Sequence, residues 1–228
     1  MLSRFEVITF DCYGTLIDWE AGIRNAFRRA LAKTGASHAL EAETFKLYEE
    51  EERRIEKEVP HLLYRKVLSK TALALAKRTG WKLTEDESHF LAEDLPRWTP
   101  FTDTNPALER LAERYSLGIL SNIDNDLIDG TLKHFPVRFD VIITAENVRS
   151  YKPRLPHFEE ARRIIGADRM WLHVAASWYH DIDPVQRVGI NAVWVNRMNV
   201  SHASPLKGDV KEVKDLEELV NRLEANEI

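Results

Sequence analysis

Cysteine is nearly absent from this chain, and long apolar runs are absent altogether. Cys12 is the single cysteine in 228 residues, which excludes an intramolecular disulfide framework and is typical of a reducing compartment. No apolar run approaches the roughly 20 residues that span a bilayer, so no membrane partner is expected. The N-terminal segment MLSRFEVITFDCYG has a short apolar run and an early acidic residue, unlike a secretory signal. These absences predict a soluble, cytoplasmic protein.

An excess of basic charge is also missing. The chain has 32 Lys and Arg against 37 Asp and Glu, for a formal net charge of −5. Nucleic-acid binding depends on clustered Lys and Arg, so no nucleic-acid partner is expected. Hydrophobic residues make up 44% and charged residues 30%, as in ordinary globular proteins. The length suits one large domain or a core with an insertion, and the assembly is left open, with a homodimer as one option.

Short apolar runs rich in β-branched and aromatic residues recur along the chain and predict buried strands. They lie at 5–10, 117–120, 141–144, 171–175 and 192–195. Helical patterns separate the later runs, at 105–115, 125–134, 156–165 and about 181–188. Strands that alternate with helices predict parallel βαβ units with right-handed crossovers. The predicted fold is therefore α/β, with a doubly wound, mostly parallel Rossmann-like sheet.

The segment from about Trp19 to Trp98 does not alternate. Its apolar pattern predicts helices only, at 21–33, 41–58, 62–78 and 85–95. Thr84 and Glu87 have the spacing of a capping box at the start of the last one. A βαβ crossover needs only a dozen or so residues, so we interpret this block as an insertion. The prediction is a core domain at 1–16 and 99–228 and a helical cap subdomain at 17–98.

Polar residues follow four of the predicted strands. They are Asp11, the pair Ser121 and Asn122, Lys152, and Asp181. In open parallel sheets, ligands bind outside the carboxyl ends of the strands. The sequence therefore predicts a small-molecule site at this edge of the sheet.

Four segments in this order resemble the motifs of the haloacid dehalogenase superfamily, and the resemblance covers essentially the whole chain. They are FDCYGTL at 10–16, LSN at 120–122, YKP at 151–153 and HVAASWYHDI at 173–182. The resemblance implies that Asp11 is a covalent nucleophile, that Ser121 holds an anionic substrate group and that Lys152 neutralises the surroundings of Asp11. It also implies a helical cap after the first motif, and Mg²⁺ bound by acidic residues of the fourth motif in phosphatase members.

Departures from the phosphatase pattern favour one branch of that superfamily. Phosphatase members carry a second Asp two residues after the nucleophile, as general acid and base; here that residue is Tyr13. An alkoxide leaving group needs a proton, whereas halide needs none. The fourth motif has Ala175 and Ala176 where a related phosphatase has an Asp that ligates Mg²⁺. The chain thus resembles the 2-haloacid dehalogenase type II branch, which implies a hydrolase acting on carbon–halide bonds with no metal and no cofactor.

Three further positions differ from that dehalogenase branch as well. Its fourth motif has a hydroxyl residue and an Asn, where this chain has Ala175, Ala176 and Ser177. Its Tyr six residues after the lysine is Phe158 here, and its early cap arginine is not matched. Two alternatives therefore stay open: a Mg²⁺-dependent phosphatase acting on a small phosphorylated metabolite, and a catalytically weak binding or regulatory member.

The leading hypothesis is hydrolysis of small 2-haloalkanoic acids to 2-hydroxyacids through an ester on Asp11, with a small anionic molecule as substrate. The residues expected to be catalytic are Asp11, Thr15, Lys152 and Asp181. Those expected to contact substrate are Cys12 (through its backbone N–H), Tyr13, Ser121, Asn122, Ser177 and Trp178. Two structural roles remain alternatives, with Asp181 capping the next helix and Ser121–Asn122 capping the helix after the second strand.

Overall fold

The computed structural model describes residues 4–37, 40–57, 61–201 and 210–228. The chain divides into two compact units. The first, here the core unit, comprises 1–18, 100–122 and 134–228, and the second comprises 19–99 and 123–133. The sequence had placed 123–133 with the core.

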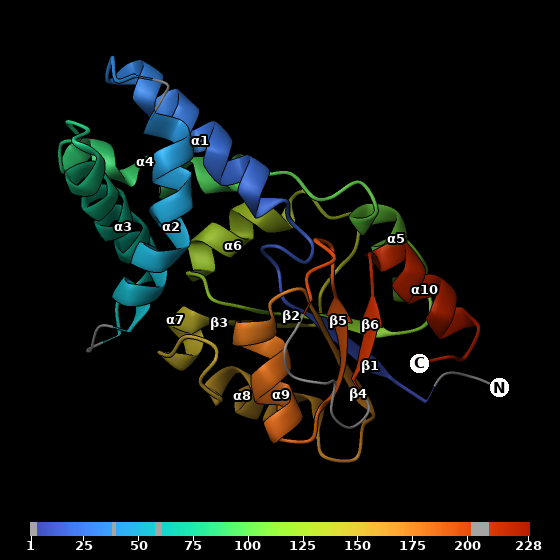
Figure 1. The fold of residues 1–228 in the computed structure, drawn as a ribbon. Coiled ribbons are helices and arrows are strands. Elements are labelled where there is room, and N and C mark those ends of the chain that lie inside the picture. The colour runs from blue at the N-terminus through green and yellow to red at the C-terminus, as the bar shows by residue number, and fades with distance from the viewer. Residues whose placement is uncertain (1–3, 38–39, 58–60, 202–209) are drawn as a thin grey trace. The chain divides into compact units, whose positions relative to one another are not determined.

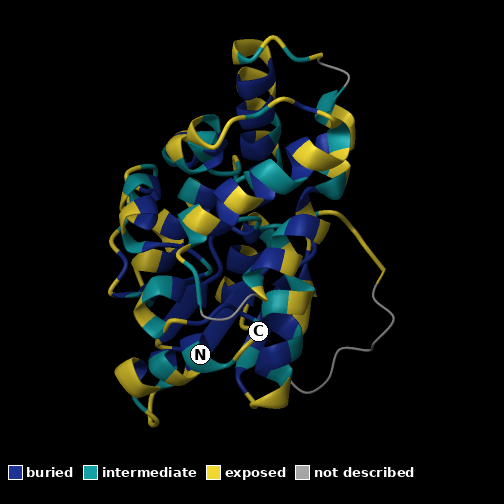
Figure 2. Cartoon of the chain, turned by 90° about the vertical axis from the view of Figure 1, so that its left-hand side faces the viewer, coloured by how far each residue is buried: buried dark blue, intermediate teal, exposed yellow. Residues whose placement is uncertain are grey.

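The core unit is built on a parallel sheet with strand order β3-β2-β1-β4-β5-β6. The strands are β1 Val7–Phe10, β2 Ser116–Ser121, β3 Val141–Thr144, β4 Trp171–Ala175, β5 Asn191–Val195 and β6 Lys211–Val213. Figure 2 draws the strands of this unit as buried and places exposed residues on the outer faces of its helices. This arrangement is the predicted α/β fold.

Helices cover both faces of the sheet, as right-handed crossovers require. α5 (Thr104–Ala112) and α10 (Leu216–Glu224) pack together on one face, and α8 (Pro156–Ile165) and α9 (Asp183–Arg187) lie on the other (Figure 1). The short helix α7 (Ala145–Val148) follows β3, and the single π turn η3 (Trp178–Ile182) precedes α9. β6 and α10 were not predicted from the sequence; β6 has only three residues, two of them exposed, and hence no apolar run.

The second unit is helical apart from its connections, as the pattern predicted. It comprises α1 Trp19–Lys33, α2 Leu40–Glu56, α3 Tyr64–Thr79, η1 Asp86–His89, α4 Phe90–Asp94, η2 Leu95–Arg97 and α6 Asn125–Leu132. Thr84 and Glu87 form the predicted capping box, in which each backbone N–H donates to the other side chain. Glu58, the expected end of the second helix, lies outside the described residues.

α6 belongs to this unit because it packs against η2, and a contact that the sequence could not reveal also connects its start to α3. The buried Asp124 carboxylate accepts hydrogen bonds from the backbone N–H groups of Tyr64 and Arg65, at 2.6 and 3.0 Å. Asp124 thereby supplies the acceptor that the first turn of α3 lacks locally. It is also the N-cap residue of α6, which corrects the alternative that Ser121 and Asn122 cap that helix.

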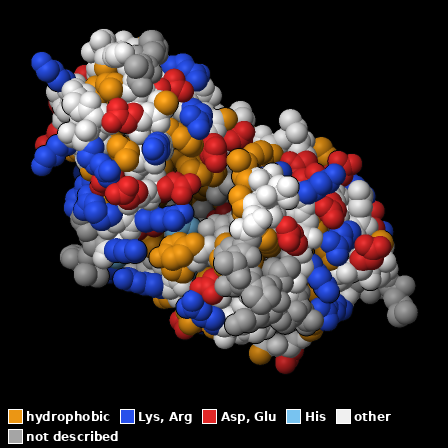
Figure 3. Space-filling model, in the orientation of Figure 1, with side chains coloured by type: hydrophobic (Ala, Val, Ile, Leu, Met, Phe, Trp, Pro, Cys, Tyr) orange, Lys and Arg blue, Asp and Glu red, His pale blue; other side chains and the backbone are white. Residues whose placement is uncertain are grey.

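None of the helices in the described part of the chain has the length and apolar character to cross a membrane. On the face shown in Figure 3, acidic and basic side chains are interspersed on both units.

Candidate active site at the carboxyl ends of the core strands

Asp11 follows the last residue of β1 and begins a tight loop. Its backbone N–H donates to the Val174 carbonyl on β4 at 3.0 Å, which continues the sheet by one residue. Gly14 has a φ of 97°, a left-handed conformation that favours glycine, and its N–H donates to the Ile17 carbonyl at 2.8 Å. The turn brings Thr15 back toward Asp11, so that the Thr15 hydroxyl donates to Asp11 Oδ2 at 2.9 Å.

Lys152 lies between α7 and α8 and is the central cation of the site. Its Nζ donates to Asp11 Oδ1 at 2.9 Å, Asp181 Oδ1 at 2.7 Å and the Leu120 carbonyl at 2.8 Å. An ammonium has three donors, so all three are used. The side chain is 1% exposed, and burial between two carboxylates fixes its position.

Asn122 holds the backbone of Lys152 in place. The Asn122 Oδ1 atom accepts from the Lys152 N–H at 2.7 Å, and its Nδ2 donates to the Lys152 carbonyl at 3.1 Å. The sequence predicted a substrate contact for Asn122. In the structure, the Asn122 amide connects the end of β2 to the loop that contains Lys152.

Asp181 lies in the π turn η3, and its carboxylate is fully buried. Oδ1 contacts both Lys152 and the Nε2 atom of His173, which is 3.0 Å away. Oδ2 has no hydrogen-bond partner among the described residues. These contacts correct the alternative that Asp181 caps the next helix, since Ile182 is the N-cap residue of α9.

Asp11, Lys152 and Asp181 shift one another's pKa values. Burial raises the pKa of Asp11, helped by the charge of Asp181 and opposed by Lys152 and Thr15. Burial also opposes ionisation of Asp181, but Lys152 and His173 outweigh it and lower the pKa to about 2. For Lys152, burial is outweighed by Asp11 and Asp181, which raise its pKa. Asp181 and Lys152 are therefore charged at neutral pH, and Asp11 is the carboxyl group that protonates first as the pH falls.

The remaining predicted substrate contacts lie at the same strand ends. Ser121 is the last residue of β2, and its buried hydroxyl has no partner among the described residues. The Cys12 side chain is fully buried, as expected for a residue offering only its backbone. Tyr13 is partly exposed in the Asp11 loop. None of these positions tests a substrate contact, so the contacts stay predictions.

Ser177 and Trp178 follow β4 and have partners within the core unit. The Ser177 hydroxyl oxygen accepts from the His180 backbone N–H at 3.1 Å and caps the π turn. Trp178 packs edge to face on Trp194, with ring centroids 5.1 Å apart. The Trp194 Nε1 donates to the Ala176 carbonyl, and the Ala176 N–H donates to Thr15 Oγ1 at 2.9 Å. This network connects the β4 end to the Asp11 loop.

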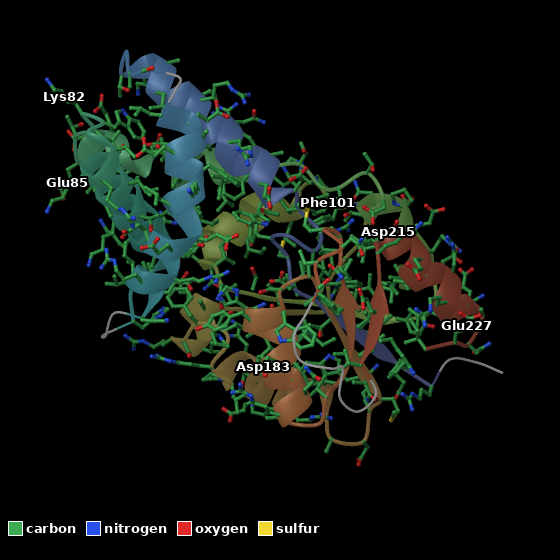
Figure 4. All side chains as sticks on the ribbon, viewed as in Figure 1. Lys82, Glu85, Phe101, Asp183, Asp215 and Glu227 are labelled. Carbon is green, nitrogen blue, oxygen red and sulfur yellow. The ribbon has the colours of Figure 1, made fainter. Side chains whose placement is uncertain are left out.

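Three residues of the site carried no role in the sequence analysis. His173 contacts Asp181, His157 contacts the Ser121 carbonyl at 3.1 Å, and Arg197 donates to the Thr15 carbonyl at 2.8 Å. Burial lowers the pKa of His157 to about 3, so this ring is neutral. A histidine in the middle of the apolar run WLHVA was a usable signal, because a buried histidine needs partners. Arg197, which lies against the Phe101 ring labelled in Figure 4, offered no such signal.

The donor set does not fit magnesium, the metal implied by phosphatase members of the superfamily. Mg²⁺ prefers oxygen ligands in octahedral geometry, whereas here an ammonium group sits between the two carboxylates. The positions that supply further acids in those phosphatases are Tyr13 and Ala176. No group of three or more His, Cys, Asp and Glu side chains among the described residues is arranged to hold a metal ion.

Comparison with known proteins gives three relevant matches. A family model described as haloacid dehalogenase-like hydrolase matches residues 8–195. The (S)-2-haloacid dehalogenase of Pseudomonas sp. (strain YL) is 31% identical over 104 residues, which is 44% of this chain and 45% of that protein. The match thus spans less than half the length of this relative. Haloacetate dehalogenase H-2 of Moraxella sp. (strain B) is 27% identical over 205 residues, covering 86% of this chain and 88% of that protein.

Among solved structures, a defluorinating L-2-haloacid dehalogenase superposes with a TM-score of 0.84. The sequences are 19% identical, and the match covers 98% of this chain and 99% of the other. At this identity the likeness establishes the fold.

Proposed function

We propose that this protein, which belongs to the haloacid dehalogenase-like hydrolase family, hydrolyses small 2-haloalkanoic acids to 2-hydroxyacids without a metal ion. The observation that carries the proposal is the set of groups around Asp11: Lys152 Nζ contacts Asp11 at 2.9 Å and Asp181 at 2.7 Å, and Tyr13 and Ala176 stand where metal-dependent members have further acids. The two dehalogenase relatives support the same reaction class.

In the first half-reaction, an Asp11 carboxylate oxygen attacks the α-carbon of the haloacid. The carbon–halogen bond breaks, halide leaves with the electron pair, and an ester forms on Asp11. Lys152 and Thr15 each donate to one oxygen of Asp11 and hold the carboxylate in one orientation. Because halide is a weak base, Tyr13 in place of an acid is compatible with this step.

The substrate carboxylate needs donors at the same strand ends. The buried Ser121 hydroxyl and the backbone N–H groups after Asp11 are the groups we assign to it. Such backbone donors favour anions where they converge.

In the second half-reaction, water attacks the carbonyl carbon of the Asp11 ester. The acyl C–O bond of the ester breaks, and the departing alkoxide oxygen takes up a proton that the attacking water gives up by way of Asp181. The 2-hydroxyacid then leaves, and the water oxygen stays in the Asp11 carboxylate. The free Oδ2 atom of Asp181 is the acceptor that we assign to the water proton. Asp181 is ionised by its contacts with Lys152 and His173, so it can accept that hydrogen bond.

Single-turnover hydrolysis in ¹⁸O water tests this mechanism directly. With the enzyme in excess over 2-chloropropionate, we expect ¹⁸O in the peptide that contains Asp11, detected by mass spectrometry. Halide release should be unaffected by EDTA. Label found only in the product would contradict the ester, and phosphate-ester hydrolysis abolished by EDTA would favour the phosphatase alternative.

The acid limb of the pH–rate profile provides a further prediction. Asp11 must be ionised to attack, so kcat/KM should fall as the pH drops through its pKa. Because the pKa of Asp11 is raised, the limb should lie above the ordinary value of about 3.9. Thr15→Val removes a hydrogen bond to the ionised form, so the limb should move up by up to about one pH unit. Thr15→Ser keeps the hydroxyl and should not move it, and equal limbs in both variants would contradict the assignment.

A further inference from the structure

Thr9, Trp171 and His173 form a buried line of hydrogen bonds that leads to Asp181. Thr9 on β1 and His173 on β4 are directly paired in the parallel register. Trp171 Nε1 donates to Thr9 Oγ1 at 2.7 Å, Thr9 Oγ1 is 2.9 Å from His173 Nδ1, and His173 Nε2 is 3.0 Å from Asp181 Oδ1. All three side chains are at most 2% exposed. The half-reactions above use only the last contact of this line, from His173 to Asp181, and leave Thr9 and Trp171 without a role.

The chemistry of the partners gives the line a direction. An indole N–H can only donate, so the Thr9 oxygen accepts from Trp171. The Thr9 hydroxyl keeps its own proton to donate, and His173 Nδ1 lies 2.9 Å from its oxygen. With that proton donated to Nδ1, the ring proton lies on Nε2 and is donated to the Asp181 carboxylate.

We propose that His173 is a positioning residue, held by Thr9 and Trp171 as the neutral Nε2–H tautomer, which orients Asp181 and keeps it ionised while the ester is hydrolysed. This role rests on the proposed function. Lys152 is shared by two carboxylates in the resting enzyme. Once Asp11 is esterified it carries no charge, and Lys152 and His173 are then the two groups that fix Asp181.

The surroundings of the ring are consistent with a fixed neutral tautomer. Phe158 of α8 packs edge to face on it at 5.5 Å between centroids, and Trp171 lies 6.5 Å away at 72°. Among the described residues, the charged or titratable groups that act on this part of the site are Asp181 of η3, Lys152 in the loop before α8, and His157 of α8, whose ring is neutral. Arg162 lies over the Trp171 ring, with its guanidinium carbon 5.2 Å from the ring centroid.

Two substitutions separate the nitrogens of His173. In His173→Gln, the amide nitrogen takes the position of Nε2 and keeps the bond to Asp181. In His173→Asn, the shorter amide reaches only the position of Nδ1, and Asp181 loses its donor. We expect His173→Asn to lower kcat about ten- to a hundredfold, as loss of an outer hydrogen-bond partner does at metal sites, and to accumulate the Asp11 ester. Ester formation in a single turnover should change much less, and Gln should restore kcat.

Nitrogen-15 NMR of histidine-labelled, unmutated protein tests the same inference without turnover. We expect a pyrrole-type signal for His173 Nε2 and a pyridine-type signal for Nδ1 between pH 6 and 8, with the assignment made from His173→Gln. The reverse tautomer or an imidazolium would overturn the proposal, as would equal kcat values for the Asn and Gln variants. A chain that turns over no haloacid but shows the expected tautomer would refute the proposed function and the role in ester hydrolysis, while leaving the hydrogen-bond direction standing.

Discussion

Asp11→Asn is expected to abolish haloacid turnover while leaving the fold intact. The amide is a poor nucleophile for carbon, so kcat should fall by about 10⁴-fold or more, as when other covalent nucleophiles are removed. The fold should tolerate the change because burial already disfavours the charged form of Asp11, whose pKa is raised. Halide release in the steady state measures the loss, and thermal unfolding checks the fold.

Asp183→Asn is the matched control for this loss of one carboxylate. Asp183, labelled in Figure 4, begins α9 just two residues after Asp181, and its side chain is 40% exposed. Its partner is Arg187 rather than a site residue. This variant should keep the parent rate. Substantial turnover by Asp11→Asn, with no sign of deamidation back to Asp in the mass spectrum, would remove the covalent mechanism.

Lys152→Met is expected to cost both activity and stability. The variant leaves two buried carboxylates without their shared cation, and breaking a buried pair in this way costs about 3–5 kcal/mol in the free energy of unfolding. Without Lys152 the pKa values of Asp11 and Asp181 rise, so the folded state binds more protons than the unfolded state. The stability deficit should therefore shrink as the pH falls. Urea unfolding at several pH values measures it.

A second substitution tests the origin of that deficit. Adding Asp181→Asn to Lys152→Met removes one of the two uncompensated charges, so the double variant should be more stable than Lys152→Met alone. Lys214→Met, at a side chain that is 76% exposed, is the control and should be close to neutral. A pH-independent deficit that the second substitution leaves unchanged would mean that lost packing, and not charge, explains it.

The fold was largely predictable because buried parallel strands leave a plain signal. The runs at 141–144 and 171–175 match β3 and β4 residue for residue, since strands covered on both faces are continuously apolar. The edge strand β6, at Lys211–Val213, escaped because two of its three residues face solvent. The grouping of α6 with the second unit escaped because it depends on packing against η2 and on contacts such as those that Asp124 accepts from residues 59 and 60 positions away.

The candidate site was predictable in its charged residues and not in its supporting ones. One network of hydrogen bonds joins Asp11, Thr15, Lys152 and Asp181. The catalytic roles of these residues stay proposals. Asn122 was expected to contact substrate; its amide binds the Lys152 backbone, and the substrate contact stays a prediction. A side-chain amide can serve either partner, and nothing in the residue type reveals which one is within reach.

The sequence by itself determined the family, the parallel α/β class of the core and the absence of an acid at position 13, because motif, period and residue type are local properties of a chain. Only the tertiary structure decided that one ammonium satisfies two carboxylates, and that a histidine buried in β4 contacts the second of them through one ring nitrogen and Thr9 through the other. The physical reason is that hydrogen bonds inside a protein join groups that are neighbours in space. Lys152 and Asp11, 141 positions apart, become neighbours only when the parallel strands align their carboxyl ends.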